Sequence, residues 1–330
     1  MSGRKGVGGG SRKVVYAALA GNLMIAVTKF VAASITGSSA MLSEGVHSLV
    51  DTGNQALLLY GMHRAAVPAT SEHPMGHGRE IYFWSFIVAL LIFSLGAGVS
   101  IYEGIIHLLD PEPSESLLIA YVVLGFSLIF EGFSWLVALR EVRAAKGSLG
   151  YFEAVRRSKD PTTFTVLFED TAALLGLLIA LIGITAAHLL DMPELDGIAS
   201  IGIGLVLAIA AILLARETKG LLIGEAAFPH VQEALLRIAA DDAAVHRANG
   251  VITLQFGPRE VFAALSAEFE DGLSTQQIEA CVKRLEARIK AAHPEVAVLF
   301  IKPQTAATWH TRIDTPGPEG GPPGLDGQAQ

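Results

Sequence analysis

The sequence is poor in cysteine and in charged residues. Cys281 is the only cysteine among 330 residues, which excludes a disulfide framework and a cysteine-based zinc site within one chain. Charged residues make up 17% of the chain and hydrophobic residues 51%, whereas average soluble domains carry about 25% charged residues. This balance indicates a membrane protein. A basic face with interleaved aromatic residues is also lacking, so a nucleic-acid partner is not expected.

Long apolar runs fill most of the first two thirds of the chain. A membrane-spanning helix needs roughly 20 apolar residues, and six segments meet this condition. They cover residues 14–35, 40–62, 81–108, 116–139, 162–189 and 197–216. The basic start, residues 1–13, is expected to be a flexible cytoplasmic tail. The run that follows it is too long for a signal peptide and is interpreted as the first span.

Among the loops that join the six spans, lysine and arginine occur in one set only. They lie before the first span, between the second and third, between the fourth and fifth, and after the sixth. The opposite loops, around Gly37, Asp110 and Asp191, contain neither residue. The positive-inside rule therefore predicts that both termini are cytoplasmic, and we expect an integral protein of the bacterial inner (plasma) membrane.

The character of the chain changes after Gly220. Residues 228–303 alternate in pattern: helical, strand-like, strand-like, helical, strand-like. We therefore expect a transmembrane domain at 14–220, a small cytoplasmic α/β domain at 221–303, and a disordered Gly- and Pro-rich tail at 304–330.

The stretch SEGVHSLVDTGNQ, residues 43–55, places polar residues inside an apolar span. On a helix, Glu44, His47, Asp51 and Asn54 form one stripe. His47 and Asp51 are four residues apart, so both can reach one divalent ion such as zinc. Because protons compete with metal for an imidazole, His47 is the expected place of exchange. The alternative, a polar helix buried in a soluble enzyme, fits poorly with the other apolar spans.

Other spans also carry ionisable residues. The neighbouring carboxylates Glu169 and Asp170 in the fifth span are best explained by a cation between helices. Lys29 in the first span is expected to pair with an acid inside the bundle. For Glu103 and Glu131, a polar contact between helices is favoured over a step in a proton path, a pairing with Lys29 is the third alternative, and all three stay open.

Histidines outside the spans are weaker evidence for metal binding. His73 and His77 are four residues apart in the link between the second and third spans, where structural and metal-uptake roles are both open. His230, His246 and His293 form no recognisable ligand cluster with one another. For these three, a surface position is favoured over regulatory metal binding.

Five pieces of the chain, between about residues 14 and 303, resemble the cation diffusion facilitator family of divalent-metal/proton antiporters. They are SEGVHSLVDTGNQ, HPMGHGREIYFWSFI, YEGIIHLLDPEP, DPTTFTVLFEDTAALLG and DGIASIGIGLVLAIAAILLARETKGLLIGEA. The fourth is most similar to the zinc transporter nine-like branch. The resemblance implies six transmembrane helices, a cytoplasmic αββαβ (ferredoxin-like) domain, and a homodimer that exchanges metal for protons.

The resemblance also implies that His47, Asp51 and Asp170 line the transport site. Most zinc-selective members place His or Asp four residues before the aspartate of the fifth span, whereas this chain has Val166 there. The site therefore lacks one usual ligand.

Glu169 is the expected replacement for that ligand. It lies about 100° round an ideal helix from Asp170, so a helix rotation or local distortion would be needed for both to share one ion. Asn22, Asn54 or a water molecule are the alternatives.

The expected function is proton-coupled efflux of a divalent cation, zinc first, from the cytoplasm by alternating access. No enzyme activity is expected, and no cofactor apart from the transported ion. The expected partners are divalent metal ions, protons, the lipid bilayer and a second copy of the chain. The alternatives are a manganese, iron or cobalt exporter of the same family, and a membrane scaffold or metal sensor that does not transport.

Overall fold

The computed structural model describes residues 9–111, 116–147 and 150–314. Their contacts divide the chain into two compact units. The first comprises residues 1–68 and 79–222, and the second comprises residues 69–78 and 223–330. Each unit is considered by itself below.

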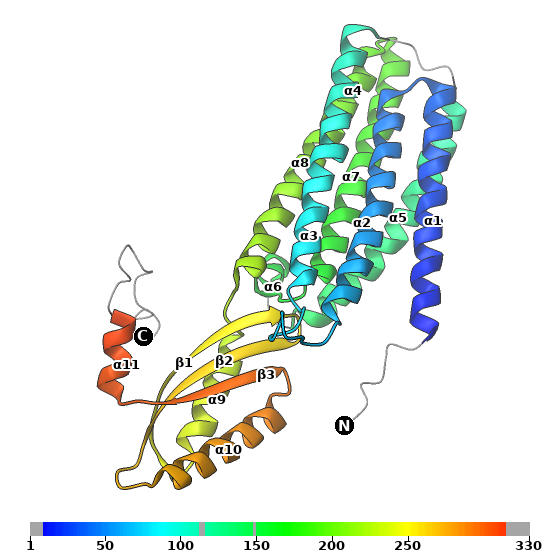
Figure 1. The fold of residues 1–330 in the computed structure, drawn as a ribbon. Coiled ribbons are helices and arrows are strands. Elements are labelled where there is room, and N and C mark those ends of the chain that lie inside the picture. Colours follow the sequence, from blue (N-terminus) through cyan, green and yellow to red (C-terminus); the bar gives the residue numbers. More distant parts are fainter. Residues whose placement is uncertain (1–8, 112–115, 148–149, 315–330) are drawn as a thin grey trace. The chain divides into compact units, whose positions relative to one another are not determined.

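The first unit is built from long helices (Figure 1). They are α1 (Gly9–Thr36), α2 (Ser39–Ala65), α3 (Glu80–Leu91), α4 (Gly98–Leu109), α5 (Leu117–Ala145), α6 (Tyr151–Arg157), α7 (Pro161–Leu190) and α8 (Glu194–Ile223). A π-helical segment, η1 (Ile92–Ala97), joins α3 and α4 into one continuous rod. Helix α1 already begins at Gly9, so the end of the expected flexible tail is helical.

Four helices in the described part of the chain are long and apolar enough to cross a membrane. They are Glu80–Leu109, Leu117–Ala144, Phe164–Leu190 and Glu194–Ile223. Helix α1 contributes a shorter apolar stretch, Asn22–Thr36. Helix α2 spans 27 residues but is less apolar because its polar stripe interrupts it. The first unit is thus a membrane-type helical domain, and the count of six spans remains a prediction.

The turn between α1 and α2 is fixed from two sides. Gly37 has a φ of +66°, a conformation that glycine adopts at little cost. The Ser38 side chain accepts a hydrogen bond from the Met41 N–H and caps α2. Asp196, in the first turn of α8, accepts hydrogen bonds from the backbone N–H groups of Ser39 (2.6 Å) and Ala40 (3.3 Å). The carboxylate thus ties the start of α8 to the start of α2.

Small residues allow α4 and α8 to approach closely. A Cβ atom added at Gly104 would lie 2.7 Å from the carbonyl oxygen of Gly197 and 2.7 Å from Ile201 Cγ1. Such contacts between glycines are a common way for membrane helices to pack, because hydrophobicity does not drive helices together in lipid.

The second unit is a small α/β domain. Its elements are α9 (Pro229–Ala240), β1 (Val245–Gly257), β2 (Glu260–Phe269), α10 (Thr275–Ala292), β3 (Val296–Pro303) and α11 (Ala306–Asp314). The strands form a sheet in the order β1-β2-β3, with β1 antiparallel and β3 parallel to β2. The first five elements follow the predicted alternation of helix and strand.

One face of this sheet forms the core of the second unit. Val261, Ala263 and Leu265 alternate along β2 and are buried together with Leu235 of α9 and Leu285 of α10. Both helices therefore cover the same face of the sheet.

Two segments of the second unit differ from the sequence-based domain plan. Residues 306–314, expected to be disordered, form α11, and its buried Trp309 lies against Gly250 of β1. Residues 69–78 belong to the second unit, since Gly78 approaches the backbone of Phe256 so closely that a Cβ atom there would lie 2.8 Å from the carbonyl oxygen. Residues 315–330 of the expected tail lie outside the described part.

Asp242, directly after α9, joins α9 to α10. It is buried and accepts two hydrogen bonds from Arg284, at 2.8 Å from Nε and 2.7 Å from Nη2. Arg288 Nη1 lies 3.7 Å from the same carboxylate. The hydrogen-bonded Arg284 guanidinium holds the pKa of Asp242 well below its usual range.

A first prediction concerns the α4–α8 contact. Gly104→Ala should lower the free energy of unfolding of the detergent-solubilised chain by about 1–3 kcal/mol, because the added methyl group must push two backbones apart. Gly125→Ala on α5 is the matched control, since a Cβ atom there meets no described atom within 4 Å. Thermal melting should separate the two variants, and equal melting temperatures would contradict the close approach.

A second prediction concerns acid stability. Because the pKa of Asp242 is lowered in the folded state, its stabilisation is present above about pH 4, the ordinary value, and is lost as the pH falls further. Asp242→Asn should destabilise the second unit at pH 7 and weaken this acid dependence. The measurement is urea unfolding of the 5-fluorotryptophan-labelled chain, followed by the fluorine signal of Trp309. An unchanged dependence on pH would show that other groups cause it.

Candidate metal site

Helix α2 carries the polar stripe that the sequence predicts. Glu44, His47 and Asn54 are buried, and the Asp51 side chain is 14% exposed. His47 and Asp51 follow each other by one helical turn, with His47 Nε2 3.5 Å from Asp51 Oδ2. The two side chains therefore meet on one face of the helix.

Several polar atoms of this stripe lack partners. In the described part of the chain, neither ring nitrogen of His47 has a hydrogen-bond partner, nor do the buried Oδ1 atoms of Asp51 and Asn54. Buried polar groups are nearly always hydrogen-bonded, because leaving one unpaired is costly. Imidazole nitrogens, a carboxylate oxygen and an amide oxygen in this state are suitable ligands for a divalent cation.

The two neighbouring carboxylates of α7 point to different helices. Glu169 is buried and accepts a hydrogen bond from Asn54 Nδ2 of α2 at 2.9 Å. Asp170 accepts one from Ser134 Oγ of α5 at 2.9 Å. Helix α7 runs without a break from Pro161 to Leu190, so its described residues show no local distortion of the kind that would let Glu169 and Asp170 share one ion. Glu169 is the acidic residue that α7 presents to the stripe on α2.

One helical turn before its two carboxylates, α7 carries Thr165 and Val166. Val166 precedes Asp170 by one helical turn and is half-buried. Thr165 precedes Glu169 by one turn, is buried, and its hydroxyl oxygen has no partner among the described residues. Sequence reasoning missed Thr165 and Ser134. Helical spacing from Glu169 could have indicated Thr165, whereas Ser134 required knowledge of how α5 and α7 pack.

Lys29 pairs with an acid inside the bundle, as the sequence predicts. Its Nζ atom lies 3.0 Å from Glu44 Oε2 and 2.7 Å from Ser48 Oγ, and the Lys29 and Glu44 side chains are fully buried. Glu44 also lies against Gly176 of α7, where a Cβ atom would collide with its carboxylate. Glu44 therefore has a positive partner of its own.

Asn22 of α1 lies at the same level of the bundle as Asp51, part of the polar stripe on α2. It precedes Lys29 by seven residues on α1, and Asp51 follows Glu44 by seven residues on α2, which runs in the opposite direction. Since Lys29 pairs with Glu44, the half-buried Asn22 is level with Asp51. Glu131 is buried on α5, about one turn before Ser134.

The described residues contain no preformed cluster of three His, Cys, Asp or Glu side chains. The candidate ligands form two groups instead, one on α2 and one on α7, linked by the hydrogen bond from Asn54 to Glu169. A bound cation would therefore be coordinated by side chains from both α2 and α7.

The histidines of the second unit have separate surroundings. The rings of His73 and His77 lie 4.6 Å apart, and Nδ1 of the buried His77 has no partner within the described chain. His230 is exposed and stacks on Phe228. His246 and His293 lie 3.3 Å and 3.0 Å from carboxylate oxygens of neighbouring glutamates. His230 and His293 both interact electrostatically with Glu295, but the described residues form no cluster of three possible ligands there. Metal binding by any of the five histidines stays a prediction.

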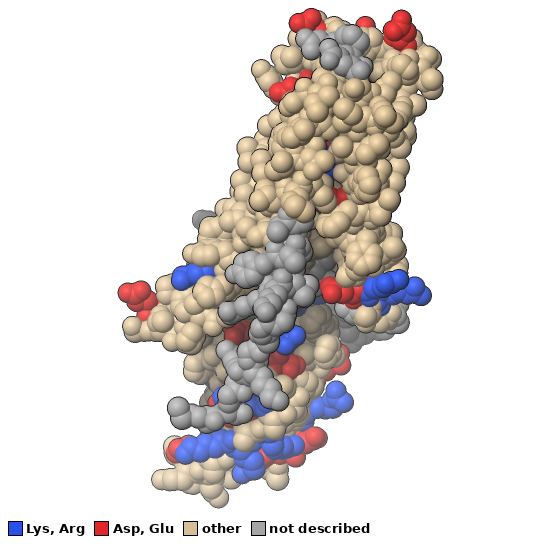
Figure 2. Space-filling view, turned by 90° about the vertical axis from the view of Figure 1, so that its right-hand side faces the viewer, with Lys and Arg blue, Asp and Glu red and all other residues tan. Residues whose placement is uncertain are grey.

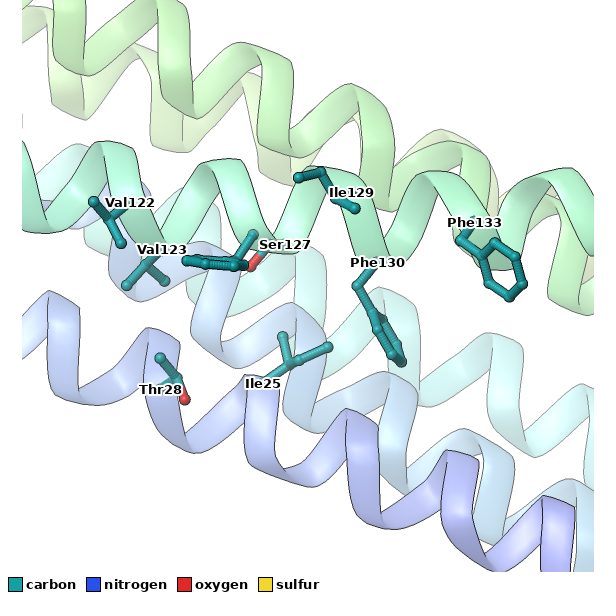
Figure 3. Close-up of a pocket in the computed structure, with 9 residues that line it drawn as sticks. Ile25, Thr28, Val122, Val123, Ser127, Ile129, Phe130 and Phe133 are labelled. Carbon is teal, nitrogen blue, oxygen red and sulfur yellow. The ribbon is translucent and has the colours of Figure 1, made fainter.

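A groove of about 630 Å³ between α1 and α5 is a different kind of surface (Figure 3). It is lined by Ile25, Thr28, Val122, Val123, Phe126, Ser127, Ile129, Phe130 and Phe133. Aliphatic and aromatic side chains dominate it, and its lining includes no His, Asp or Glu, so it offers no typical metal ligand.

Comparisons with known proteins match these observations. A family model described as the cation efflux transmembrane domain matches residues 15–223. The mitochondrial proton-coupled zinc antiporter SLC30A9 of Xenopus laevis is 39% identical over 271 residues, which are 81% of this chain and 48% of that protein. The cation-efflux pump FieF of Cronobacter sakazakii is 26% identical over 296 residues, which are 88% of this chain and 91% of that protein. The chain thus spans about half the length of the antiporter.

A third prediction tests the buried ion pair. Lys29→Met leaves the Glu44 carboxylate buried without its counter-charge and should cost about 3–5 kcal/mol of stability. The double variant Lys29→Met/Glu44→Gln should be more stable than Lys29→Met alone, because no isolated charge remains. Thermal melting of the full chain with each single and the double variant gives the coupling energy. Additive effects would show that the two side chains do not interact.

Proposed function

Because the chain belongs to the cation diffusion facilitator family of cation efflux proteins, in its zinc transporter nine-like branch, we propose that it exports a divalent cation, zinc first, in exchange for protons. The main support is the pair of the buried His47 and the half-buried Asp51 on α2, with Glu169 of α7 hydrogen-bonded to the same stripe. Neither ring nitrogen of His47 nor Oδ1 of Asp51 has a hydrogen-bond partner in the described part of the chain. The named relatives are transporters and not enzymes.

Four side chains supply the proposed ligands. His47 provides a nitrogen, and Asp51 and Glu169 provide carboxylate oxygens. Asn54, which now donates to Glu169, has a buried Oδ1 that is unpaired within the described chain. Asp170, engaged by Ser134 on the side of α5, contributes charge and is the ligand that the family resemblance favours.

Proton exchange follows from the chemistry of these ligands. Imidazole and carboxylate groups must be deprotonated to bind metal, so loading the cation releases protons and unloading it takes them up. Glu44 is balanced by Lys29, which leaves Asp51, Glu169, Asp170 and the buried Glu131 of α5 as the acids that respond to the cation's charge. Alternating access would expose the same groups to each side of the membrane in turn.

The proposed topology has six spans with both termini in the cytoplasm, and α1 and α2 complete the count. The loops around Gly37, Asp110 and Asp191 lack Lys and Arg. On the face shown in Figure 2, this end of the helical unit displays acidic side chains and no basic ones among the described residues. The bacterial inner membrane is favoured because the match to the bacterial pump extends over 91% of that protein.

A homodimer through the ferredoxin-like second unit is part of the proposal. Opposite its core, the sheet presents Phe262 packed against Phe256 and Phe300, and the Phe300 side chain is 59% exposed. An exposed aromatic cluster of this kind is typical of a protein–protein interface.

A second candidate function is export of manganese, iron or cobalt. It is favoured by the replacement of a usual nitrogen or carboxylate ligand by Val166, which leaves His47 as the nitrogen donor among oxygens from Asp51, Asn54, Glu169 and Thr165. Oxygen-rich sites suit harder ions than zinc.

A fourth prediction tests both candidates. Metal flux is measured in proteoliposomes with an imposed pH gradient, using zinc, manganese, iron and cobalt in turn. Asp51→Asn and Glu169→Gln should each reduce proton-dependent flux by about tenfold or more, since each removes a proposed ligand. Val166→His should raise the preference for zinc. Glu153→Gln, which changes an exposed acid on α6, is the matched control.

The outcomes separate the hypotheses. Zinc flux that depends on Asp51 and Glu169 supports the zinc exporter, and flux restricted to manganese or iron supports the alternative. If no metal moves with the wild-type chain under any gradient, the transporter proposal is wrong. A membrane scaffold or metal sensor would then take its place.

A further inference from the structure

The first unit contains a polar hollow at the end that carries the α1–α2 turn. Its volume is about 340 Å³, and the polar residues that line it include Ser38, Ser39, Glu103, His107 and Asp110. Unlike the groove of Figure 3, it contains both imidazole and carboxylate groups.

Three of these residues share one face of α4. Glu103, His107 and Asp110 lie at i, i+4 and i+7 at the end of the helix. Glu103 is half-buried and Asp110 is exposed, so both can reach ions that enter the hollow from solvent. The spacing of Glu103 and His107 is the same as that of His47 and Asp51, with the order of the two residue types reversed.

His107 is the observation that points to a ligand. Its side chain is 9% exposed and lines the hollow, and its Nε2 atom has no hydrogen-bond partner among the residues described. The nearest acidic atom, Asp196 Oδ2, is 3.8 Å away, too far for a hydrogen bond.

Asp196 has other partners. Its carboxylate accepts hydrogen bonds from Ser38 Oγ (2.8 Å), Ser39 N (2.6 Å), Ser39 Oγ (3.2 Å) and Ala40 N (3.3 Å). It thereby offsets the positive end of the α2 dipole, which would otherwise repel a cation from the hollow. The imidazole of His107 remains available for a different partner.

The charge around the hollow favours a cation. The three loops at this end of the unit contain no Lys or Arg in the sequence. Acidic side chains without intervening basic ones concentrate cations near the surface. Figure 2 shows the same acidic end from one side.

The hollow is separate from the candidate metal site. Along α2, Ser39 and His47 are eight residues apart, which is roughly 12 Å on an α-helix, and Asp51 is roughly 18 Å from Ser39. One cation cannot contact both groups at that separation.

We propose that Glu103 and His107, with Asp110 at the rim, bind a second divalent cation of the zinc class in this hollow. An imidazole ligand selects such ions over magnesium and calcium. With two or three protein ligands, the ion keeps some of its water and exchanges readily. This site has a role in transport that rests on the proposed function: the hollow holds the transported cation after it leaves His47 and Asp51.

The test measures how many zinc ions the purified chain binds, and how tightly. Zinc binding is measured by equilibrium dialysis in an Asp51→Asn background, which weakens the site on α2. Adding His107→Gln or Glu103→Gln should weaken one zinc-binding step by about tenfold or more. His188→Gln is the matched control, because His188 is an exposed histidine in the last turn of α7 at the same end of the unit. It should leave the binding curve unchanged.

Glu103→Gln keeps the result interpretable if His107→Gln disturbs folding, since the Glu103 side chain is only half-buried. Binding curves that coincide in the background, Glu103→Gln and His107→Gln proteins would overturn the proposal, and so would an equal loss in His188→Gln. The readout is independent of flux. A chain that binds zinc here but transports nothing would refute the proposed function and leave this site intact.

Discussion

Charge balance inside an apolar bundle is the constraint on which the rest of this structure depends. Lys29 of α1 and Glu44 of α2 are fully buried, and each is tolerable there because the other lies 3.0 Å away. The pair fixes the position of α1 relative to α2 along the helix axes. Gly176 of α7 leaves room for the Glu44 carboxylate, so a third helix is packed around the same interaction. Local pairing thus determines how three helices meet.

The same constraint separates structural from functional charges. Lys29 balances Glu44, and helix α7, which carries Glu169 and Asp170, contains no lysine or arginine. Arg64, the one basic residue of this kind on α2, lies in the last turn of the helix and pairs with Glu80, so it does not balance Asp51. Glu169 and Asp170 rely on amide and hydroxyl donors from Asn54 and Ser134, which are weaker than a counter-charge. A divalent cation would complete the balance, and this need is the physical basis of the proposed site.

The sequence predicted the stripe on α2, the pairing of Lys29 with an acid inside the bundle and the order of elements in the second unit, because all three follow from spacing or composition. It did not predict that this acid is Glu44 rather than Glu103 or Glu131, which depends on how α1 packs against α2. It could not predict which α7 carboxylate faces α2, since that depends on the rotation of one helix against its neighbours. The hydroxyl of Ser134 was missed for the same reason, whereas Thr165 follows from helical spacing once Glu169 is known to face α2. Helix α11 was missed because it depends on Trp309 packing against Gly250 of β1, a contact distant in sequence.

A passage for ions needs sites that bind well enough to attract the ion and weakly enough to release it. Histidine with a carboxylate four residues away occurs twice in the described part of the first unit, but in different surroundings. His47 is buried in the bundle, with Asp51 beside it and a carboxylate from α7 nearby. His107 borders a hollow whose carboxylates are half-buried or exposed, so water competes for the ion there. Under the proposed function, this difference in the burial of the carboxylates makes the site at His47 the stronger and the site at His107 the weaker, which is the order that release toward the acidic end requires.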